Sequence, residues 1–363
     1  MGDKQLGGLV NMGLTCYANA VMQAMRHCKK VPWILEEGRY TTLLKKGATG
    51  TRDKQQILTK SFANTVQLLQ QCKIRQSVRP ADFWRKFHTC IEEHSFGTFD
   101  KFKHKMCHDS HEFYICLLDI LHDSMAQEVE MRIVREPPTT ETDRHCVQAL
   151  TAWKQQFSKN YSPFVDLFYG LYHYVVTCKG CGKGSHRWEP FTELKGVPPI
   201  SGSGDGAKEP VSLLEMIREE FKPTMIGDYD CDTCRAEAKG RTEAVQTVSV
   251  WRFPKYLVIH LKRFGNDGKK IHTPLLTLPN HGESPVSFES LYSDETPEKG
   301  GSCAYKLVSM VDHHGHSMAG HYTAQARSTE DTTKWHIFDD DSCTPIPNPV
   351  FGSSTYMMWF ERS

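Results

Sequence analysis

Two C-x-x-C pairs constrain the fold of this 363-residue chain more than any other feature. The pairs are Cys178 with Cys181 and Cys231 with Cys234, and a strand-and-loop segment separates them. Two intervening residues allow both thiolates of a pair to face one ion, and two pairs complete a tetrahedral four-sulfur shell. One pair alone could be a redox pair, but two favour zinc. Because a closed shell leaves no position for water, we expect one structural zinc ion that clamps a long β-ribbon.

Net charge and cysteine count limit the classes of partner and compartment. The chain has 44 basic and 43 acidic residues and a net charge of +1, so we expect neither nucleic acid nor a membrane as a partner. The N-terminus lacks the apolar region of a signal peptide, and no segment approaches the length of a membrane span. Thirteen cysteines, an odd number, do not suggest a disulfide framework. We therefore expect a cytoplasmic or nuclear protein.

The hydrophobic period changes along the chain from helical to strand-like. Residues 1–130 are mostly helical in pattern, and a short helix is predicted around Leu150. Segments rich in β-branched and aromatic residues follow at 171–177, 245–251, 256–264, 305–311, 321–327, 335–338 and 356–361. One predicted helix at 213–221 interrupts them after a flexible loop at 201–206. Helices first and strands later predict an α+β fold with an antiparallel sheet.

A cysteine at the start of a helix is the candidate nucleophile. The run from Asn11 to Asn19 is a turn that leads into a helical pattern, with Thr15 as the predicted N-cap. Cys16 then lies in the first turn, where unpaired N–H groups and the helix dipole favour an anion and lower a thiol pKa. The alternative is a small buried hydrophobic residue, which is the commoner role of cysteine.

A segment rich in histidine and glycine, at 313–322, supplies the candidate base. His321 follows Gly320 and begins a predicted strand, so its direction is fixed. Three acids end the strand at 335–338, and Asp339, the first of them, is placed to orient the imidazole and stabilise its charged form. Two alternatives stay open: the histidines could bind a metal, and the acids could form an exposed turn or a calcium site.

These motifs together resemble the ubiquitin-specific protease family, a group of papain-like cysteine deubiquitinases. The run at 8–19 is similar to the family's Cys box, and a His box extends from Tyr305 through His313, Gly315, Gly320, His321 and Tyr322 to Asp339 and Asp340. The segment at 168–170 before the first C-x-x-C pair, the strand at 257–264 and the closing strand at 356–362 also match. The resemblance covers nearly the whole chain.

The resemblance implies one catalytic domain over residues 1–363 with the shape of a right hand. A helical thumb would occupy about 1–165, zinc-tipped fingers mainly 166–250, and an antiparallel-sheet palm mainly 251–363. The fingers would grip ubiquitin, while the thumb and palm would carry the catalytic groups.

The resemblance also implies the role of each site residue. Cys16 would be the nucleophile, His321 the base and Asp339 its orienting acid. Asn11 would donate to the oxyanion, and Asp340 would be a second supporting acid. The implied substrate-binding residues are Asp109, Gly320 and Tyr322. The chain departs from the family pattern at Cys107 and His108, where two glutamines are usual, and at Leu14 and Ala18 in the Cys box.

The implied reaction is hydrolysis of the isopeptide or peptide bond after the C-terminal glycine of ubiquitin, through a thioester. The expected partners are ubiquitin and ubiquitinated proteins, and an inactive ground state that needs a regulatory protein partner stays open. One alternative is a non-catalytic ubiquitin-binding adaptor with a structural zinc, but such a protein would lack a triad member. Another is a metal-dependent hydrolase that uses the histidines at 313–321, whose activity chelators would abolish.

Overall fold

The computed structural model describes residues 6–92, 97–104, 106–134, 137–200, 209–237, 240–265, 267–301, 303–316 and 319–363. The predicted loop at 201–206 lies outside these residues, as do residues 317 and 318 of the histidine-rich segment.

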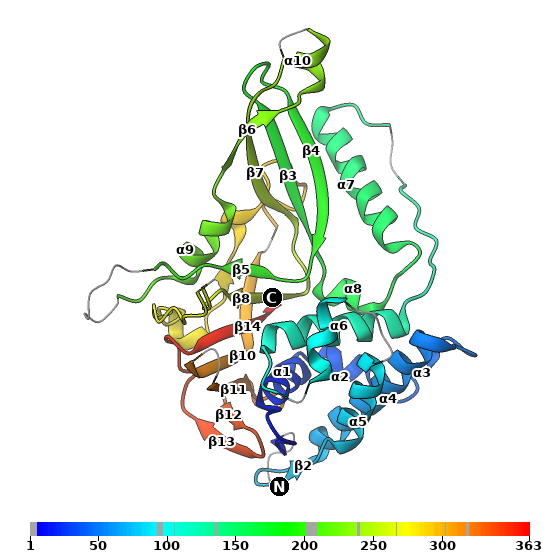
Figure 1. Ribbon diagram of the computed structural model, residues 1–363, viewed down its shortest axis with the longest axis vertical. Coiled ribbons are helices and arrows are strands. Elements are labelled where there is room, and N and C mark those ends of the chain that lie inside the picture. The colour runs from blue at the N-terminus through cyan, green and yellow to red at the C-terminus, as the bar shows by residue number, and fades with distance from the viewer. Residues whose placement is uncertain are drawn as a thin grey trace.

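Helices form the N-terminal part of the chain, as the sequence predicts (Figure 1). They are α1 (Cys16–His27), α2 (Lys30–Ile34), α3 (Tyr40–Leu43), α4 (Gly50–Gln71), α5 (Ala81–Glu92), the 3-10 helix η1 (Gly97–Lys103), α6 (Ser110–Met125), α7 (Glu141–Phe157) and α8 (Pro163–Phe168). Helix α1 is the central one, because every one of its 12 residues is buried. The helix predicted around Leu150 is α7, which is longer than expected because Thr140 and Asp143 form a capping box at its start.

A large sheet forms the palm. In the described part of the chain it has eight strands, in the order β13-β12-β11-β10-β14-β8-β5 with β9 beside β10. The strands are β5 (Leu194–Gly196), β8 (Tyr256–Leu261), β9 (Val286–Ser287), β10 (Ala304–His316), β11 (Ala319–Arg327), β12 (Trp335–Asp339), β13 (Ser342–Ile346) and β14 (Thr355–Arg362). Neighbouring strands are antiparallel except β5 and β8, which are parallel. The predicted α+β class is confirmed.

A second sheet extends away from the palm and forms the fingers (Figure 1). Its strand order is β4-β3-β7-β6, with β3 (Gly170–Cys178), β4 (Gly184–Phe191), β6 (Thr224–Tyr229) and β7 (Thr242–Arg252). The short helix α10 (Asp232–Ala236) lies at the tip, and α7 runs beside β4. The smaller elements are the pair β1 (Gly8–Leu9) and β2 (Ser77–Val78), helix α9 (Leu213–Arg218) and the 3-10 helices η2 (Glu219–Phe221), η3 (Pro279–Gly282) and η4 (Glu289–Leu291).

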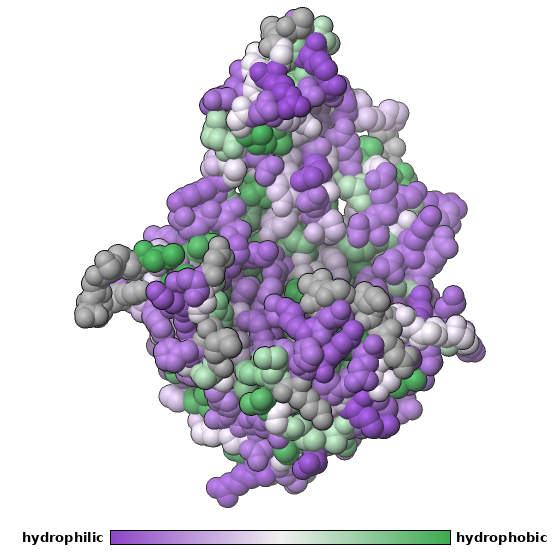
Figure 2. Space-filling view, viewed as in Figure 1, coloured by the Kyte–Doolittle hydropathy of each residue, from purple (hydrophilic) through white to green (hydrophobic). Residues whose placement is uncertain are grey.

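Thumb and palm share one hydrophobic core. The cluster that contains Cys16 and the rest of the apolar face of α1 also contains Tyr322 from β11 and Trp359 from β14. A second cluster lies between the palm sheet, α9 and the base of the fingers. The outer face shown in Figure 2 is largely hydrophilic, with hydrophobic residues in small separate groups. Among the described helices, none combines the length and the apolar character that a membrane span requires. The proposed thumb, finger and palm boundaries stay a prediction.

The strands that the sequence did not predict lie at sheet edges or carry polar residues. Strand β13 contains Pro345 and is the last strand of the palm sheet, and β4, with Pro190, is an edge strand of the fingers. Proline is tolerated at such edges because one side needs no ladder hydrogen bond. The predicted strand at 256–264 ends at Leu261, because the Arg263 side chain turns inward and donates to the carbonyls of Thr273 and Gly352.

Candidate active site and metal centre

Helix α1 begins at Cys16, which places the candidate nucleophile in the first turn of a buried helix. Thr15 is the N-cap residue, as predicted, although its side chain makes no capping hydrogen bond. The Thr15 hydroxyl accepts the Met12 N–H at 2.9 Å, and the Asn11 side-chain oxygen accepts the N–H groups of Gly13 and Thr15. These bonds hold the turn before Cys16, where Gly13 has a φ of 99° that favours glycine. The Thr15 side chain therefore does not cap the first N–H groups of α1.

Several neighbours lower the pKa of the Cys16 thiol to about 6. The largest effect is a hydrogen bond with the side chain of Cys107, which outweighs the opposing effect of burial. The backbone N–H of Tyr322 and the charge of His321 also favour the thiolate. The same hydrogen bond raises the pKa of Cys107, so Cys107 is the donor of the pair. The thiolate form is thereby favoured on Cys16 and disfavoured on Cys107.

His321 lies on β11 opposite an acid on the neighbouring strand β12. Its Nε2 atom is 2.6 Å from Oδ1 of Asp339. Burial lowers the pKa of His321, but the hydrogen bond to Asp339 and the charges of Cys16 and Asp339 raise it, with a net increase. The sequence placed Asp339 just beyond its strand, whereas it is the last residue of β12. The structure thus brings together the predicted base and its predicted orienting acid.

Asp340 forms a different set of contacts from Asp339. Its φ of 48° turns the carboxylate toward the thumb, where it accepts hydrogen bonds from the side-chain amides of Asn11 and Asn19, each at 2.8 Å. The Asn19 amide also donates to the Leu9 carbonyl at 3.1 Å. Asp340 therefore orients the predicted oxyanion donor Asn11, and the role of Asn11 itself stays a prediction.

The predicted substrate-binding residues lie around the same site. Asp109 caps α6 by accepting the N–H groups of His111 and Glu112, and its other oxygen accepts the Tyr356 hydroxyl at 2.5 Å. Glu112, three residues after this cap, pairs with Lys101. Both oxygens of Asp109 are thus engaged within the protein, so a substrate cation would have to share them.

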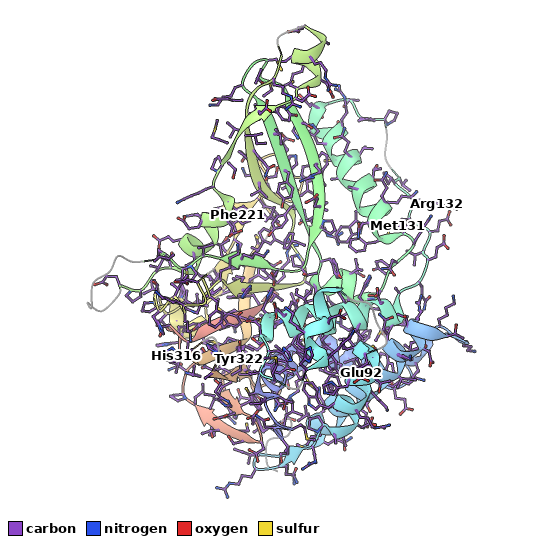
Figure 3. The ribbon with its side chains drawn as sticks, viewed as in Figure 1. Glu92, Met131, Arg132, Phe221, His316 and Tyr322 are labelled. Atoms are coloured by element: carbon purple, nitrogen blue, oxygen red, sulfur yellow. The ribbon has the colours of Figure 1, made fainter. Side chains whose placement is uncertain are left out.

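Gly320 and Tyr322 lie on β11 beside His321. A Cβ atom on Gly320 would lie 2.0 Å from Nε2 of His313, so only glycine fits there. The Tyr322 ring packs on His313 with ring centroids 4.6 Å apart, and Figure 3 shows Tyr322 at the junction of the palm strands and the thumb helices. Because the His313 ring is buried under these neighbours, it is a packing residue of the palm.

The four predicted metal ligands meet at the tip of the fingers. Cys178 is the last residue of β3 and Cys181 follows it, whereas Cys231 and Cys234 lie at helix α10 (Figure 1). Their sulfur atoms all lie within 4.8 Å of one another, and Sγ distances of 3.6 Å join Cys178 to Cys234 and Cys181 to Cys231. A tetrahedral zinc with Zn–S bonds of about 2.3 Å places its sulfurs about 3.8 Å apart. The four cysteines are therefore compatible with one zinc ion.

The sequence profile of a known family covers almost the whole chain. The family described as "Ubiquitin carboxyl-terminal hydrolase" matches residues 7–360. The chain belongs to this family. The resemblance inferred from the motifs is thereby confirmed.

Individual members of the family match over the same extent. Ubiquitin carboxyl-terminal hydrolase 2 from Homo sapiens is 28% identical over 358 residues, which cover 98% of this chain and 55% of that protein. The Rattus norvegicus protein of the same name is 30% identical over 362 residues, and ubiquitin carboxyl-terminal hydrolase 21 from Homo sapiens is 26% identical over 373 residues. The chain spans about half the length of the human and rat hydrolase 2 proteins.

A solved structure of the family confirms the fold. It is the SAGA Ubp8/Sgf11/Sus1/Sgf73 DUB module bound to ubiquitin aldehyde, with a TM-score of 0.68 and 18% sequence identity. The match covers 99% of this chain and 70% of that chain. The predicted fold of helices and antiparallel sheets is therefore shared with that structure.

Two contributors to this family site were not predicted from the sequence. Cys107 was noted only as a departure from the family pattern, although its thiol is the hydrogen-bond donor to Cys16. Asn19 was part of the Cys box but had no assigned role, whereas its amide holds Asp340. The only signal for Cys107 in the sequence was its position two residues before Asp109, a predicted substrate-binding residue. Its contact with Cys16 joins residues 91 positions apart in the chain, and no local pattern shows such a contact.

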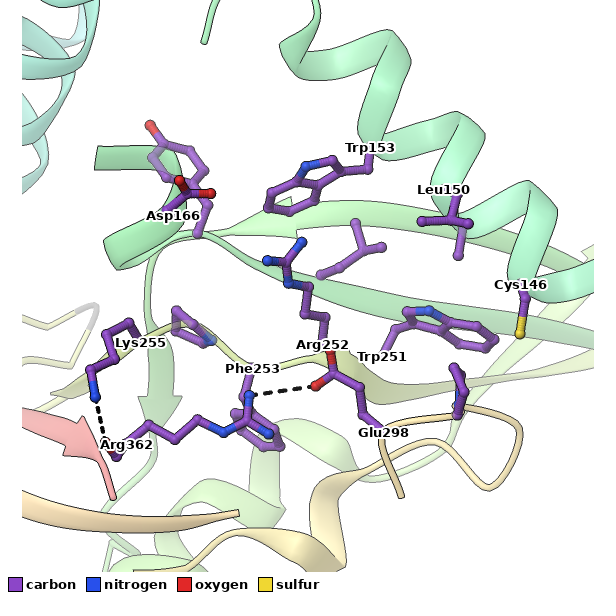
Figure 4. A pocket seen from close by; sticks show the side chains of 15 residues that line it. Cys146, Leu150, Trp153, Asp166, Trp251, Arg252, Phe253, Lys255, Glu298 and Arg362 are labelled. Carbon is purple, nitrogen blue, oxygen red and sulfur yellow. Dashed lines mark hydrogen bonds and ion pairs between the residues drawn. The ribbon is translucent and has the colours of Figure 1, made fainter. Parts of the chain in front are cut away.

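A groove of about 610 Å³ lies elsewhere on the molecule, between α7, the end of β7 and the C-terminal strand (Figure 4). Its walls include Trp153, which the Arg252 guanidinium covers at 4.7 Å from the ring centroid. Arg362 pairs with Glu298 across the groove at 3.6 Å. The triad residues do not line it.

Proposed function

We propose that this protein is a cysteine-dependent deubiquitinase, a thiol-dependent ubiquitinyl hydrolase that cleaves the bond after the C-terminal glycine of ubiquitin. The observation that carries the proposal is the Cys16 thiol at the start of α1, which interacts electrostatically with His321 of the hydrogen-bonded pair His321 and Asp339. A thiolate opposite an oriented imidazole is the arrangement that covalent acyl transfer requires. Family membership supports the choice of substrate.

Each residue of the site has its own role in the proposed reaction. The Cys16 thiolate attacks the terminal carbonyl of ubiquitin, and Asn11 with backbone N–H groups stabilises the oxyanion. His321, held by Asp339, gives its proton to the departing amine, and the thioester forms. His321 then takes a proton from water, which attacks the thioester and releases ubiquitin with a free carboxylate. The proposed ligands of the ubiquitin tail are Asp109, Gly320 and Tyr322.

We infer that the fingers carry one structural zinc, held by Cys178, Cys181, Cys231 and Cys234. The fit of their sulfur distances to a tetrahedral shell supports this ion. When bound, the zinc would hold the β3 end against α10 without taking part in the reaction. None of the thirteen cysteines forms a disulfide, which fits a protein of the cytoplasm or nucleus.

Mutation of the nucleophile tests the proposal. Cys16→Ala is expected to abolish release of the fluorophore from a ubiquitin–fluorophore amide while ubiquitin binding is retained. Cys72→Ala, which removes a half-buried thiol outside the site, is the matched control and is expected to keep full turnover. Normal turnover by Cys16→Ala would overturn the proposal.

A metal-dependent hydrolase is the second candidate, because donor atoms of His321, Asp339 and Asp340 lie within 4.8 Å of one another. That candidate predicts activity that chelators abolish and thiol alkylation leaves intact. The proposed cysteine mechanism predicts the opposite result for alkylation. An adaptor without activity would show no turnover in either experiment.

A further inference from the structure

Three imidazoles and one carboxylate from four separate segments converge at the base of the fingers. His145 lies on α7, His173 on β3, His186 on β4, and Glu295 follows η4. We refer to these four residues as the His145 cluster. It is separate from the triad and from the four cysteines at the finger tip, and it occupies the place where α7 runs beside β4 (Figure 1).

The donor atoms of the cluster are close to the spacing of a metal shell. Nδ1 of His145 is 2.5 Å from Oε2 of Glu295, and Nδ1 of His186 is 3.9 Å from the same oxygen. Donor atoms of these three residues all lie within 4.8 Å of one another. Nε2 of His173 is 2.9 Å from Nδ1 of His186. Ligands about 2.0–2.2 Å from a tetrahedral zinc would be about 3.4 Å apart, so modest movements suffice.

Packing and a hydrogen bond fix the orientation of the His173 ring. His145 and His173 are buried, at 7% and 1% exposure, and the Trp188 ring stacks on His173 with centroids 4.8 Å apart. The other ring nitrogen of His173, Nδ1, lies 2.9 Å from the Ser293 hydroxyl. An oxygen partner on the second nitrogen is the usual way in which proteins aim a histidine at a metal, because it fixes which nitrogen keeps its lone pair.

A hydrogen-bonded network without metal is the competing explanation for these contacts. The rings of His145 and His186 stack at 4.0 Å with 28° between their planes. Because an ion lies in the plane of each imidazole that binds it, metal binding requires these two rings to turn toward Glu295. The His186 and Glu295 side chains are 16% and 36% exposed, so they are less enclosed than His173 and can make that rotation. The two explanations therefore differ in an outcome that can be measured.

We propose that the His145 cluster binds a second Zn²⁺ ion, through His145, His186 and Glu295 with His173 as the fourth donor. Three imidazoles and one carboxylate suit zinc, whereas Mg²⁺ and Ca²⁺ prefer shells made of oxygen. The ion would connect α7, β3, β4 and the segment after η4. The hydrophobic cluster of buried residues at this junction is small, and comprises Cys146, Ala149, Leu171, Trp188 and Trp251. A metal there would therefore fix the direction of the fingers relative to α7.

Metal counting on the full chain tests the proposal. The protein is loaded with Zn²⁺, dialysed, and analysed for zinc per chain. We expect two equivalents in the wild type, one in Glu295→Gln and one in Cys231→Ser, because the two sites are independent. His281→Gln, which removes an exposed histidine outside the cluster, is the matched control and is expected to keep two. Ser293→Ala is expected to weaken binding of the second ion about 10–100-fold.

Cobalt spectra separate failure of this site from failure of the cysteine site. Co²⁺ bound by the four cysteines gives thiolate charge-transfer bands, whereas Co²⁺ in the His145 cluster gives ligand-field bands alone. Cys231→Ser is expected to lose the charge-transfer bands and keep the ligand-field bands of the cluster. A wild type that holds only the thiolate-bound ion would overturn the proposal, as would Glu295→Gln protein that keeps two zinc equivalents. Should Glu295→Gln misfold, the Ser293→Ala titration decides, and an unchanged affinity would refute the assignment.

Discussion

Cys107 gives the Cys16 thiol its low pKa, and this makes the activity dependent on pH in a defined direction. With a pKa of about 6, the Cys16 thiolate is present above that pH and is lost as the pH falls through it. His321 has a raised pKa, so its proton persists above the usual range and is lost at higher pH. We therefore expect kcat/KM for a ubiquitin–fluorophore substrate to rise with an apparent pKa near 6 and to decline on the alkaline side. An acid limb near the ordinary thiol pKa would contradict this.

Substitution of Cys107 separates its effect from that of His321. Cys107→Ala removes the hydrogen bond that lowers the pKa of Cys16, so the acid limb of the pH profile is expected to move upward. Cys107→Ser keeps a hydrogen-bond donor to Cys16 at the same place. The apparent pKa of its acid limb is therefore expected to lie closer to that of the wild type. If the acid limb has the same apparent pKa in Cys107→Ala and in the wild type, then His321 and the Tyr322 N–H are sufficient to lower the pKa of Cys16.

Asp340 holds the Asn11 side chain in place, and this hydrogen bond limits how Asn11 can take part in catalysis. One N–H of the Asn11 amide is used by Asp340 at 2.8 Å, so the other is the donor for an oxyanion. Asn11→Ala is expected to lower kcat about 10²–10³-fold with little change in KM, because the oxyanion exists only in the transition state. Steady-state kinetics measure this split. A change confined to KM would assign Asn11 to substrate binding instead.

The roles of single residues were predictable only where a motif or a helix start carried them. The start of α1 at Cys16 followed from the turn and the apolar period. The separate functions of Asp339 and Asp340 did not, because they depend on the positive φ of Asp340, which points its carboxylate to the thumb. Such a turn has no clear signature in a run of three acids.

Strand β11 depends on a glycine beside the catalytic histidine. A Cβ at Gly320 would lie 2.0 Å from the buried His313 ring and 2.8 Å from the His314 carbonyl oxygen, so neither neighbour can move easily. Gly320→Ala is expected to lower the free energy of unfolding by about 1–3 kcal/mol. Gly227→Ala on β6, where a Cβ would meet nothing within 4 Å, is the control. Equal stability of the two variants in urea unfolding would contradict the close contact.

The local stability of the finger tip is expected to depend on its metal ion, whereas that of the palm is not. The cysteines form a cluster of their own at the tip, away from the core that thumb and palm share. Cys234→Ser is therefore expected to lose the finger-tip zinc and to speed amide hydrogen exchange in β6 and α10. Exchange in α1 and β14 should be unchanged. Slow exchange at the tip of the variant would show that the ribbon holds without the ion.

The elements that the sequence predicted are those with a clear buried face. Strand β8 is buried along its whole length, and its β-branched run predicted it. Strand β6 is mostly exposed on both faces and contains Gly227, so it shows no alternation. It is a strand because β7 supplies hydrogen bonds beside it, and that pairing depends on residues about 20 positions away. Local patterns do not contain such information.

At the scale of the whole molecule, the catalytic groups come from two parts that share one core. Cys16 enters from the thumb, whereas His321 and Asp339 come from adjacent palm strands. The hydrophobic cluster that includes Cys16 and Tyr322 joins these parts, so the triad does not depend on the fingers for its assembly. The order of motifs along the chain predicted this arrangement through the family resemblance. The His145 cluster, drawn from four distant segments, had no sequence pattern that could reveal it.

Covalent capture of the nucleophile tests the account most directly. The protein is incubated with ubiquitin that carries an electrophile in place of its C-terminal carboxylate, and the adduct is measured by intact mass and mapped by peptide sequencing. We predict one ubiquitin per chain, attached to Cys16, in the wild type and in Cys72→Ala, and none in Cys16→Ala. An adduct on Cys107 or on any other cysteine, or no adduct on a folded wild-type chain, would contradict the assignment of Cys16 as the nucleophile.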